Sequence, residues 1–383
     1  MTEWREYKLS EIMETSKKQF KPDNNSQLNY IGLEHIEQGS LRLSGVGASS
    51  TVESNKFFFN KGDVLFGKLR PYFRKVIYAP FDGICSTDIW VCKAKSCCDQ
   101  KFLFYFLANQ DFIDTANTDE GSRMPRASWD YLKDTLWILP PLHEQKAIAE
   151  VLSSLDDKID FLTRQNNTLE DFAQTYFRRW FVEDSSDDWD VGKAEDYFEI
   201  GIGKTPPRKE HKWFTNNPND KVWISIADMG KSGLFIGDSS EYLTSEAVER
   251  FNIRRVPKGS ILLSFKLTVG RVAVALCELT TNEAIAHFKY KEAIYREYLY
   301  CYLKSFDYNS LGSTSSIATA INSTIIKEMP FVMPDKCKLT KFHELTAPIF
   351  RKIETNILQM TTLQKLRDTL LPKLISGEVR VKQ

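Results

Sequence analysis

The sequence predicts an α+β protein in which two similar globular domains, each a small mixed or antiparallel sheet with short helices, are separated by two long helices. Three observations predict this class: a repeat with a period near 200 residues, short apolar runs within each repeat, and a heptad pattern after each globular part. The 383 residues exceed one ordinary domain, and 42% of them are apolar, which is enough to build more than one core.

The repeat is clearest at the end of each globular part. DYLKDTLWILPP (130–141) resembles TIIKEMPFVMPD (324–335), and DKIDFLTRQNNTL (157–169) resembles RKIETNILQMTTL (351–363), both at an offset of 194 residues. Four pairs of residues show the offset: Lys133 and Lys327, Ile138 and Val332, Pro140 and Pro334, and Ile159 and Ile353. A looser likeness continues upstream, between 60–79 and 257–275. A single period of this length indicates a duplicated domain, related by an internal pseudo-two-fold, and not a solenoid.

The offset divides the chain into four segments. We expect a first globular domain over residues 1–139, a first long helix over 140–182, a second globular domain over 183–333, and a second long helix with a C-terminal tail over 334–383. Between the first helix and the second domain, VEDSSDDWD (182–190) carries five carboxylates and no basic residue. We interpret it as a linker; the alternative interpretation is a metal site.

Within each globular part, apolar runs rich in β-branched and aromatic residues are bounded by Gly, Pro, Asn or Asp. This pattern predicts strands and turns over 57–69, 74–83 and 254–267. Two further runs, QKFLFYFLANQDFI (100–113) and YREYLYCYLKSF (295–306), predict short helices that pack under the sheet.

The long helices follow a coiled-coil pattern. In the first helix, positions spaced four and three residues apart predict a seam of Ile148, Leu152, Leu155, Ile159, Leu162 and Leu169. In the second, the predicted seam contains Ile349, Ile353, Met360 and Leu363. Pro140 and Pro141 suit the first turn of a helix. An apolar stripe about 60 Å long needs a partner, and the simplest one is the other helix. The alternative is that both are ordinary core helices of one domain.

The chain lacks the usual catalytic motifs. FEIGIGKT (198–205) fails as a phosphate-binding loop because Phe198 stands where the first glycine is required, and no HExxH occurs. The five histidines lack ligand spacing, and the seven cysteines form no CxxC pair. Glu144 and Lys146 could belong to a nuclease, but we expect them on the surface of a helical N-terminus. We therefore predict no catalytic residue and no metal site.

Charge is balanced overall, with 51 basic and 51 acidic residues, but basic residues gather at equivalent places in the two repeats. Arg and Lys can neutralise phosphates, and Arg, Ser and Thr can also read base edges. The candidate DNA-binding residues are Lys68, Arg70, Arg74, Lys75, Ser122, Arg123, Arg126, Lys204, Arg208, Lys209, Lys266, Arg271, Ser313 and Thr314. The alternative is a solvated strand face. We find no signal peptide and no apolar run of 18 residues, so we expect a cytoplasmic protein without a membrane partner.

One segment carries a specific resemblance. LPPLHEQKAIAEVLSSLDDKID (139–160) resembles the conserved region of the specificity subunits of type I restriction-modification systems, and LQKLRDTLLPKLISGEVRV (363–381) resembles that family's second conserved region. YIGLEHIEQG, KGDVLFGKLRP and IGKTPPRKE resemble segments of its target recognition domains. The second helix departs from the first, since PDKCKLTKFHEL (334–345) lacks the Pro-Pro and Glu-Gln pairs.

The resemblance implies a non-catalytic subunit that reads a split DNA sequence in the major groove, one part per domain. It implies that the two helices pack antiparallel and set the spacing between the parts. Two modification subunits would bind S-adenosylmethionine and methylate adenine, and two restriction subunits could add ATP- and Mg-dependent translocation and cleavage. This chain itself would bind no cofactor. Since the domains differ in sequence, the target should be asymmetric and bipartite.

Two alternatives remain open. One is a fused methyltransferase or nuclease whose catalytic motif is unrecognised; alone with S-adenosylmethionine and DNA, such an enzyme would methylate. The other is a coiled-coil adaptor, which would show no salt-dependent DNA binding.

Overall fold

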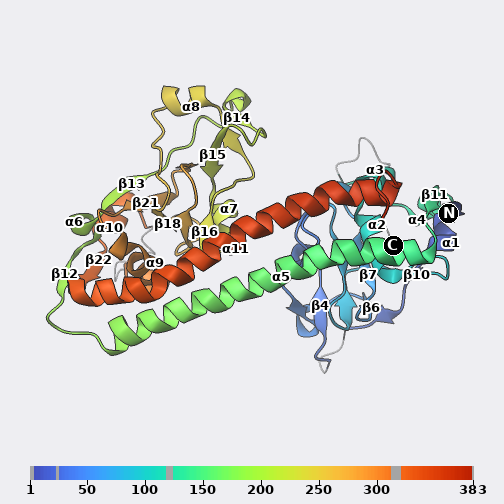
Figure 1. The fold of residues 1–383 in the computed structure, drawn as a ribbon, viewed down its shortest axis with the longest axis horizontal. Helices are drawn as coiled ribbons and strands as arrows, with labels where there is room; N and C mark the ends of the chain where they lie inside the picture. The colour runs from blue at the N-terminus through green and yellow to red at the C-terminus, as the bar shows by residue number, and fades with distance from the viewer. Residues whose placement is uncertain (1–3, 23–25, 118–123, 312–320, 382–383) are drawn as a thin grey trace. The chain divides into compact units, whose positions relative to one another are not determined.

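The computed structural model describes residues 4–22, 26–117, 124–311 and 321–381. The chain forms two compact units, Met1–Ile159 with Thr361–Gln383, and Asp160–Met360. Each unit contains one globular domain and part of each of two long helices, α5 (Leu142–Arg178) and α11 (Lys336–Ser376) (Figure 1). None of the helices in the described ranges combines the length and apolarity needed to span a membrane.

The first unit is built on three small sheets. An antiparallel pair joins β1 (Arg5–Lys8) to β11 (Leu136–Leu139). An antiparallel four-stranded sheet has the order β2 (Met13–Ser16), β10 (Ile89–Ala94), β7 (Val64–Gly67), β8 (Val76–Tyr78). A mixed five-stranded sheet has the order β3 (Gln19–Phe20), β6 (Lys56–Phe59), β9 (Gly83–Cys85), β4 (Asn29–Ile31), β5 (Gly47–Ala48). The α-helices are α1 (Leu9–Ile12), α2 (Gln100–Ala108), α3 (Gln110–Ala116) and α4 (Trp129–Leu132).

The second unit repeats this plan. The pair is β12 (Asp190–Lys193) with β22 (Pro330–Met333). The larger sheet has the order β13 (Glu199–Ile202), β21 (Ile285–Lys289), β18 (Ile261–Ser264), β19 (Val272–Ala275), β16 (Phe235–Ile236). The remaining sheet has the order β14 (Phe214–Thr215), β17 (Tyr242–Leu243), β15 (Lys221–Ile224), β20 (Thr280–Thr281). The α-helices are α6 (Ala194–Tyr197), α7 (Ile226–Lys231), α8 (Ser245–Arg250), α9 (Arg296–Ser305) and α10 (Ser323–Lys327). The expected α+β class and the duplication are therefore confirmed.

Equivalent contacts recur in the two units. Lys8 forms an ion pair with Asp134 at 3.1 Å, and Lys193 forms one with Glu328 at 2.8 Å. Each pair ties the strand that opens a domain to the short segment before its last strand. The predicted helices 100–113 and 295–306 correspond to α2 with α3 and to α9, and both α2 and α9 are largely buried against a sheet.

The long helices pack antiparallel within each unit. In the first unit, Asp156 of α5 binds Arg367 of α11, with 2.8 Å between carboxylate and guanidinium. In the second, the Asn356 amide of α11 donates to the Asn166 side chain of α5 at 2.8 Å, and Phe181 lies edge-on to Phe342 with centroids 5.0 Å apart. Residues later in α5 therefore contact residues earlier in α11, so the two helices run antiparallel, as the resemblance implied.

The predicted seam residues lie on buried or partly buried faces of the helices. The buried ones are Ile148, Leu152, Ile159, Leu162 and Ile353, and the partly buried ones are Leu155, Leu169, Ile349, Met360 and Leu363. Beside Ile349, Phe350 is fully buried, because its ring packs against Phe235 and Tyr300 of the second domain. α11 therefore packs against the second sheet domain as well as against α5.

One expectation about the start of α5 was wrong. Glu144 is not a surface residue; it is buried, accepts a hydrogen bond from the Trp4 indole at 3.2 Å and binds the Arg380 guanidinium at 2.7 Å. Gln145 is also buried, and its amide donates to the Cys97 and Pro140 carbonyls. The Glu-Gln pair therefore anchors the helix start to the first domain and to the C-terminal tail.

A buried histidine makes the second unit sensitive to acid. His287 on β21 is fully buried, with Nε2 2.9 Å from the Thr281 hydroxyl, while Nδ1 has no hydrogen-bond partner. Burial, with the positive charges of Arg254 and Lys289, lowers the pKa of His287 to about 3. Since the unfolded chain takes up this proton near pH ~6.5, the contribution to stability is present above that pH and is lost as pH falls towards 3.

We therefore expect His287→Gln to flatten the pH dependence of the unfolding free energy. Below pH ~6, its slope should be shallower than that of the unsubstituted chain by up to about 1.4 kcal/mol per pH unit. Urea unfolding at pH 7, 6 and 5 measures the two slopes, so a constant loss of stability caused by the substitution itself does not interfere. Parallel pH profiles would contradict the expectation.

Candidate nucleic-acid interface

Two hairpin loops with similar closing hydrogen bonds join corresponding strands of the two units, β7 to β8 in the first and β18 to β19 in the second. The β7–β8 loop is closed by a hydrogen bond from the Gly67 amide to the Lys75 carbonyl at 2.8 Å, and the β18–β19 loop by one from Ser264 to Arg271 at 2.9 Å. Three residues after each closing amide, the chain turns left-handed, at Arg70 (φ 53°) and at Leu267 (φ 61°). The two loops carry many of the basic residues predicted to contact DNA.

Two of these cations are fastened within their own domains. Lys75 Nζ donates to the Leu33 carbonyl at 2.5 Å, and Arg271 donates to the Ile226 carbonyl at 2.6 Å. Both acceptors lie at the first turn of the helical segment that follows β4 or β15. Because the two bonds are equivalent, they indicate that Lys75 and Arg271 hold the hairpins in place, and their charged groups do not extend freely into solvent.

Arg74 also points inward. Its guanidinium lies 3.5 Å from the Asp368 carboxylate on α11, and burial lowers the pKa of Arg74 below its usual range. Its backbone is also left-handed (φ 49°). The position therefore links the hairpin to the helix pair of the first unit.

The other described candidate residues of the first domain lie beside this hairpin, at the end of the four-stranded sheet that we call the rim. The Lys68 amide donates to the Asp88 carbonyl and the Arg70 amide to the Pro125 carbonyl, at 2.9 and 2.8 Å. Arg126 forms a half-exposed ion pair with Asp88 at 3.5 Å. The structure thus brings Lys68, Arg70 and Arg126 together. Four predicted residues lie outside the described residues: Ser122, Arg123, Ser313 and Thr314.

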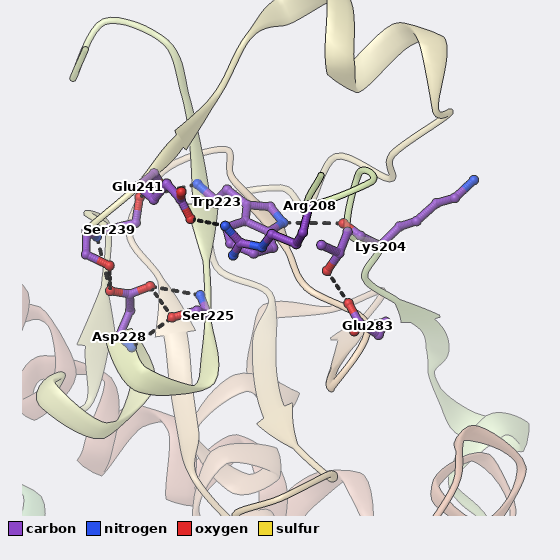
Figure 2. A network of polar contacts seen from close by, with 10 residues as sticks. Lys204, Arg208, Trp223, Ser225, Asp228, Ser239, Glu241 and Glu283 are labelled. Carbon is purple, nitrogen blue, oxygen red and sulfur yellow. Dashed lines mark hydrogen bonds and ion pairs between the residues drawn. The ribbon is translucent and has the colours of Figure 1, made fainter. Parts of the chain in front are cut away.

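In the second domain, the loop after β13 lies against β15 (Figure 2). The Trp223 indole donates to the Lys204 carbonyl at 3.3 Å, and Lys204 Nζ, on the exposed side, donates to the Phe251 carbonyl at 2.6 Å. The neighbouring Thr205 hydroxyl donates to the Glu283 carboxylate. These contacts fix the Gly/Pro-rich loop at the same rim as the β18–β19 hairpin.

Arg208 is the most tightly positioned cation of this loop. Its guanidinium lies 4.2 Å from the Phe214 ring centroid and 4.6 Å from that of Trp223, and it binds the Glu241 carboxylate at 2.6 Å (Figure 2). Stacking on the rings fixes the plane of the guanidinium, and the carboxylate fixes its rotation within that plane. About half of the side chain remains exposed, so the group is held while staying accessible.

A buried carboxylate supports Glu241 from below. Asp228 accepts hydrogen bonds from the amide and hydroxyl groups of Ser225 and Ser240, at 2.6–3.1 Å. Burial opposes its charge, but these hydrogen bonds outweigh burial and lower the pKa of Asp228. Ser239 then donates to the Glu241 carbonyl at 2.7 Å. Asp228 thus orders the turn that presents Glu241 to Arg208.

Comparison with known proteins decides the family. A family model described as the type I restriction modification DNA specificity domain matches residues 1–171 and again residues 186–359. The chain belongs to this family. The double match agrees with the 194-residue offset, because each match covers one globular domain and more than half of the helix after it.

Relatives in the specificity-domain family match most of the chain. It is 27% identical over 337 residues to the MjaIX specificity subunit of Methanocaldococcus jannaschii, covering 81% of this chain and 72% of that protein. It is 22% identical over 465 residues to the HindI specificity subunit of Haemophilus influenzae, covering 99% and 100%. The S subunit of a type I restriction-modification system from M. genitalium has a similar fold, with a TM-score of 0.54, 16% identity, and 97% and 96% of the two chains covered.

Sequence reasoning did not find several residues that shape these specificity-domain rims. Glu241, Phe214 and Trp223 orient Arg208, but Phe214 lies on β14, Trp223 on β15 and Glu241 directly before β17, so no local sequence pattern links them to Arg208. Two predicted cations, Lys209 and Lys266, are exposed, and Lys266 Nζ lies 5.5 Å from the Phe265 ring centroid. With Lys204, the rim of the second domain therefore contains three exposed lysines and one accessible, oriented arginine.

Proposed function

We propose that this chain reads DNA sequence for a type I restriction-modification complex, binding an asymmetric bipartite target with one half-site per domain. One observation carries the proposal: the two domains present equivalently built rims whose side chains differ. Where the first rim places Arg70 in the left-handed turn, the second places Leu267. An equivalent scaffold with different contact residues suits two different half-sites.

The chemistry of each rim supports DNA as the ligand. Exposed Lys204, Lys209 and Lys266 can neutralise phosphates, and a planar, oriented guanidinium such as that of Arg208 can read a base edge. Acidic residues are interleaved with these cations, so affinity should come from geometry as well as from charge.

In this proposal the chain is not an enzyme and binds no cofactor. Two modification subunits would bind S-adenosylmethionine and methylate adenine within the target. Two restriction subunits would supply ATP- and Mg-dependent translocation and cleavage. The modification subunits would dock on the exposed faces of α5 and α11.

The proposal is tested by selecting DNA from a randomised duplex pool with the purified full-length chain. We expect enrichment of a motif with two unlike halves separated by a fixed number of unspecified base pairs. Affinity for that motif should fall steeply with salt, at roughly 0.9 logarithmic units per decade of salt for each phosphate contact. Enrichment of no motif, or binding that is independent of salt, would favour a coiled-coil adaptor instead. Methylation by the chain alone would reveal a hidden methyltransferase.

The spacing function of the helices gives a second prediction. We expect that adding one heptad to α5 after Leu162 and one to α11 after Met360 will lengthen the motif's spacer. Seven residues add about 10 Å of helix, the rise of roughly three base pairs. Inserting the heptads in both helices preserves their antiparallel pairing. An unchanged spacer in the selected motif would exclude the helices as the ruler.

A further inference from the structure

The β18–β19 hairpin exposes an apolar side chain in an unfavourable backbone conformation. Leu267 is 97% exposed, so it contributes almost nothing to the core. Its φ of 61° lies in the left-handed region, where a β-carbon crowds the following carbonyl. An exposed leucine held in this region does not stabilise its own chain by packing. We therefore take its role to be contact with another molecule.

The surrounding hairpin imposes this conformation. The Ser264 hydroxyl donates to the Thr268 carbonyl at 2.6 Å and accepts from the Arg271 amide at 3.1 Å. The Gly270 amide donates to the Ser264 carbonyl at 3.0 Å. Arg271, fixed by its bond to Ile226, closes the base of the loop. The tip is therefore a built feature that exposes Leu267 most fully, with exposed Lys266, Thr268 and Val269 beside it.

The first domain carries a different, partly buried side chain at the corresponding position. Arg70 also has a positive φ and lies three residues after the closing amide of its hairpin. The full backbone conformations differ, since Arg70 has a ψ of 65°, whereas the Thr268 amide donates to the Lys266 carbonyl at 2.7 Å and closes a γ-turn at Leu267. A cation in one copy and an aliphatic group in the other suit two unlike half-sites, which offer different base edges.

The neighbours of Leu267 point to DNA as the occupant. The Phe265 amide donates to the Ala284 carbonyl at 2.9 Å, which places the hairpin next to Glu283 and the Lys204 loop of Figure 2. Lys266, directly beside the tip, is exposed. An exposed cation beside an exposed apolar tip suits a groove that offers phosphates at its edges and a methyl group on its floor. In the major groove, that methyl group is the 5-methyl of thymine.

We infer that Leu267 is a specificity-determining residue that packs against the 5-methyl group of a thymine in the half-site read by the second domain. The inference rests on the proposed function and adds the base and the chemical group that are recognised. It differs from the contacts of Arg208, which involve hydrogen bonding.

The experiment removes the methyl group and the leucine separately and together. The full-length chain first selects its motif from a randomised duplex pool. Each thymine of the motif is then replaced singly by deoxyuridine, and affinity is measured for the unsubstituted chain and for Leu267→Gly. At one thymine of the second half-site, we expect the unsubstituted chain to lose about fourfold in affinity with the methyl group, and Leu267→Gly to lose nothing further.

Two controls separate recognition from folding. Glycine is favoured at positive φ and no packing is removed, so Leu267→Gly should melt at the same temperature as the unsubstituted chain or higher. Val191→Ala removes another exposed apolar group from the same unit and should keep the full sensitivity to deoxyuridine.

Three results would overturn the inference. These are equal losses at every thymine for both proteins, no thymine whose methyl group matters, and a melting temperature several degrees lower for Leu267→Gly, which would make the leucine a packing residue. A motif that forms without a Leu267-dependent thymine removes this inference and leaves the proposed function standing. Failure to enrich any motif removes both.

Discussion

Replacing Arg367 with methionine should destabilise the chain by about 3–5 kcal/mol, because it leaves a carboxylate in a buried site without its counter-charge. The Arg367 side chain is only 3% exposed and binds the Asp156 carboxylate at 2.8 Å. Asp156 also accepts a hydrogen bond from the Tyr105 hydroxyl at 2.7 Å. Burial opposes the charge of Arg367, but Asp156 and Asp368 outweigh it and raise the pKa of Arg367.

The expected loss is large because this network joins four parts of the first unit. Tyr105 belongs to α2, Asp156 to α5 and Arg367 to α11, while the Arg367 guanidinium also donates to the Ser40 carbonyl at 3.2 Å. Through Asp368, the network reaches Arg74 and the β7–β8 hairpin. The substitution should therefore loosen the hairpin that we propose to face DNA, as well as the helix pair.

Urea unfolding at neutral pH measures the effect. Lys365→Met serves as the matched control, because it removes one exposed cation from the same helix and should change stability by less than about 0.5 kcal/mol. Combining Arg367→Met with Asp156→Leu should recover part of the loss, since an apolar pair can replace a buried ion pair. If Arg367→Met changed the free energy of unfolding no more than Lys365→Met, the network would not stabilise the fold.

The second unit fills the corresponding place with different chemistry. At the 194-residue offset, Asp156 corresponds to Phe350 and Arg367 to Ala173, both buried. Tyr300 of α9 packs edge-on against Phe350, with centroids 5.5 Å apart, and its hydroxyl donates to Glu170 at 2.6 Å. The repeat in the sequence predicted which parts of the helices contact the sheet domains. It did not predict that the contact is an ion pair in the first unit and an aromatic contact in the second.

The features that sequence patterns predicted correctly are local. The start of α5 follows from Pro140 and Pro141, and the strands and short helices follow from apolar runs a few residues long. The burial of Glu144 was missed because its partner Arg380 lies 236 residues further along the chain. No periodic pattern carries information about such a pair.

The hairpin loops show a different limit. Aligned without a gap from Lys61-Gly62 and Lys258-Gly259, the two sequences pair Arg70 with Leu267, and both have a positive φ three residues after the closing amide. The sequences thus show which residues correspond, but only the fold shows that Leu267 is exposed and Arg70 partly buried.

Replacing Arg208 with lysine should relax the DNA sequence preference at one guanine, lowering the discrimination by about 1–3 kcal/mol, or roughly 5- to 150-fold. Lysine keeps the positive charge but loses the planar pair of N–H groups that can reach guanine O6 and N7 together. In the structure, one guanidinium nitrogen is used by Glu241, at 2.6 Å, and the ring faces of Phe214 and Trp223 hold its plane. The group is thus pre-oriented before DNA arrives, which limits the entropy lost on binding.

Glu241→Gln isolates this orientation from the base contact itself. Since Arg208 would still be present but less firmly held, we expect the same guanine to be affected, by a smaller factor than with Arg208→Lys. Lys209→Met is the matched control from the same loop: loss of a phosphate contact should weaken binding to all sequences equally and reduce the salt slope by about one. Selection from a randomised duplex pool, repeated with each variant, measures all three. If Arg208→Lys and Lys209→Met shifted affinity alike without changing any position of the motif, Arg208 would be a phosphate contact or a structural cation, and Glu241 would have no part in reading sequence.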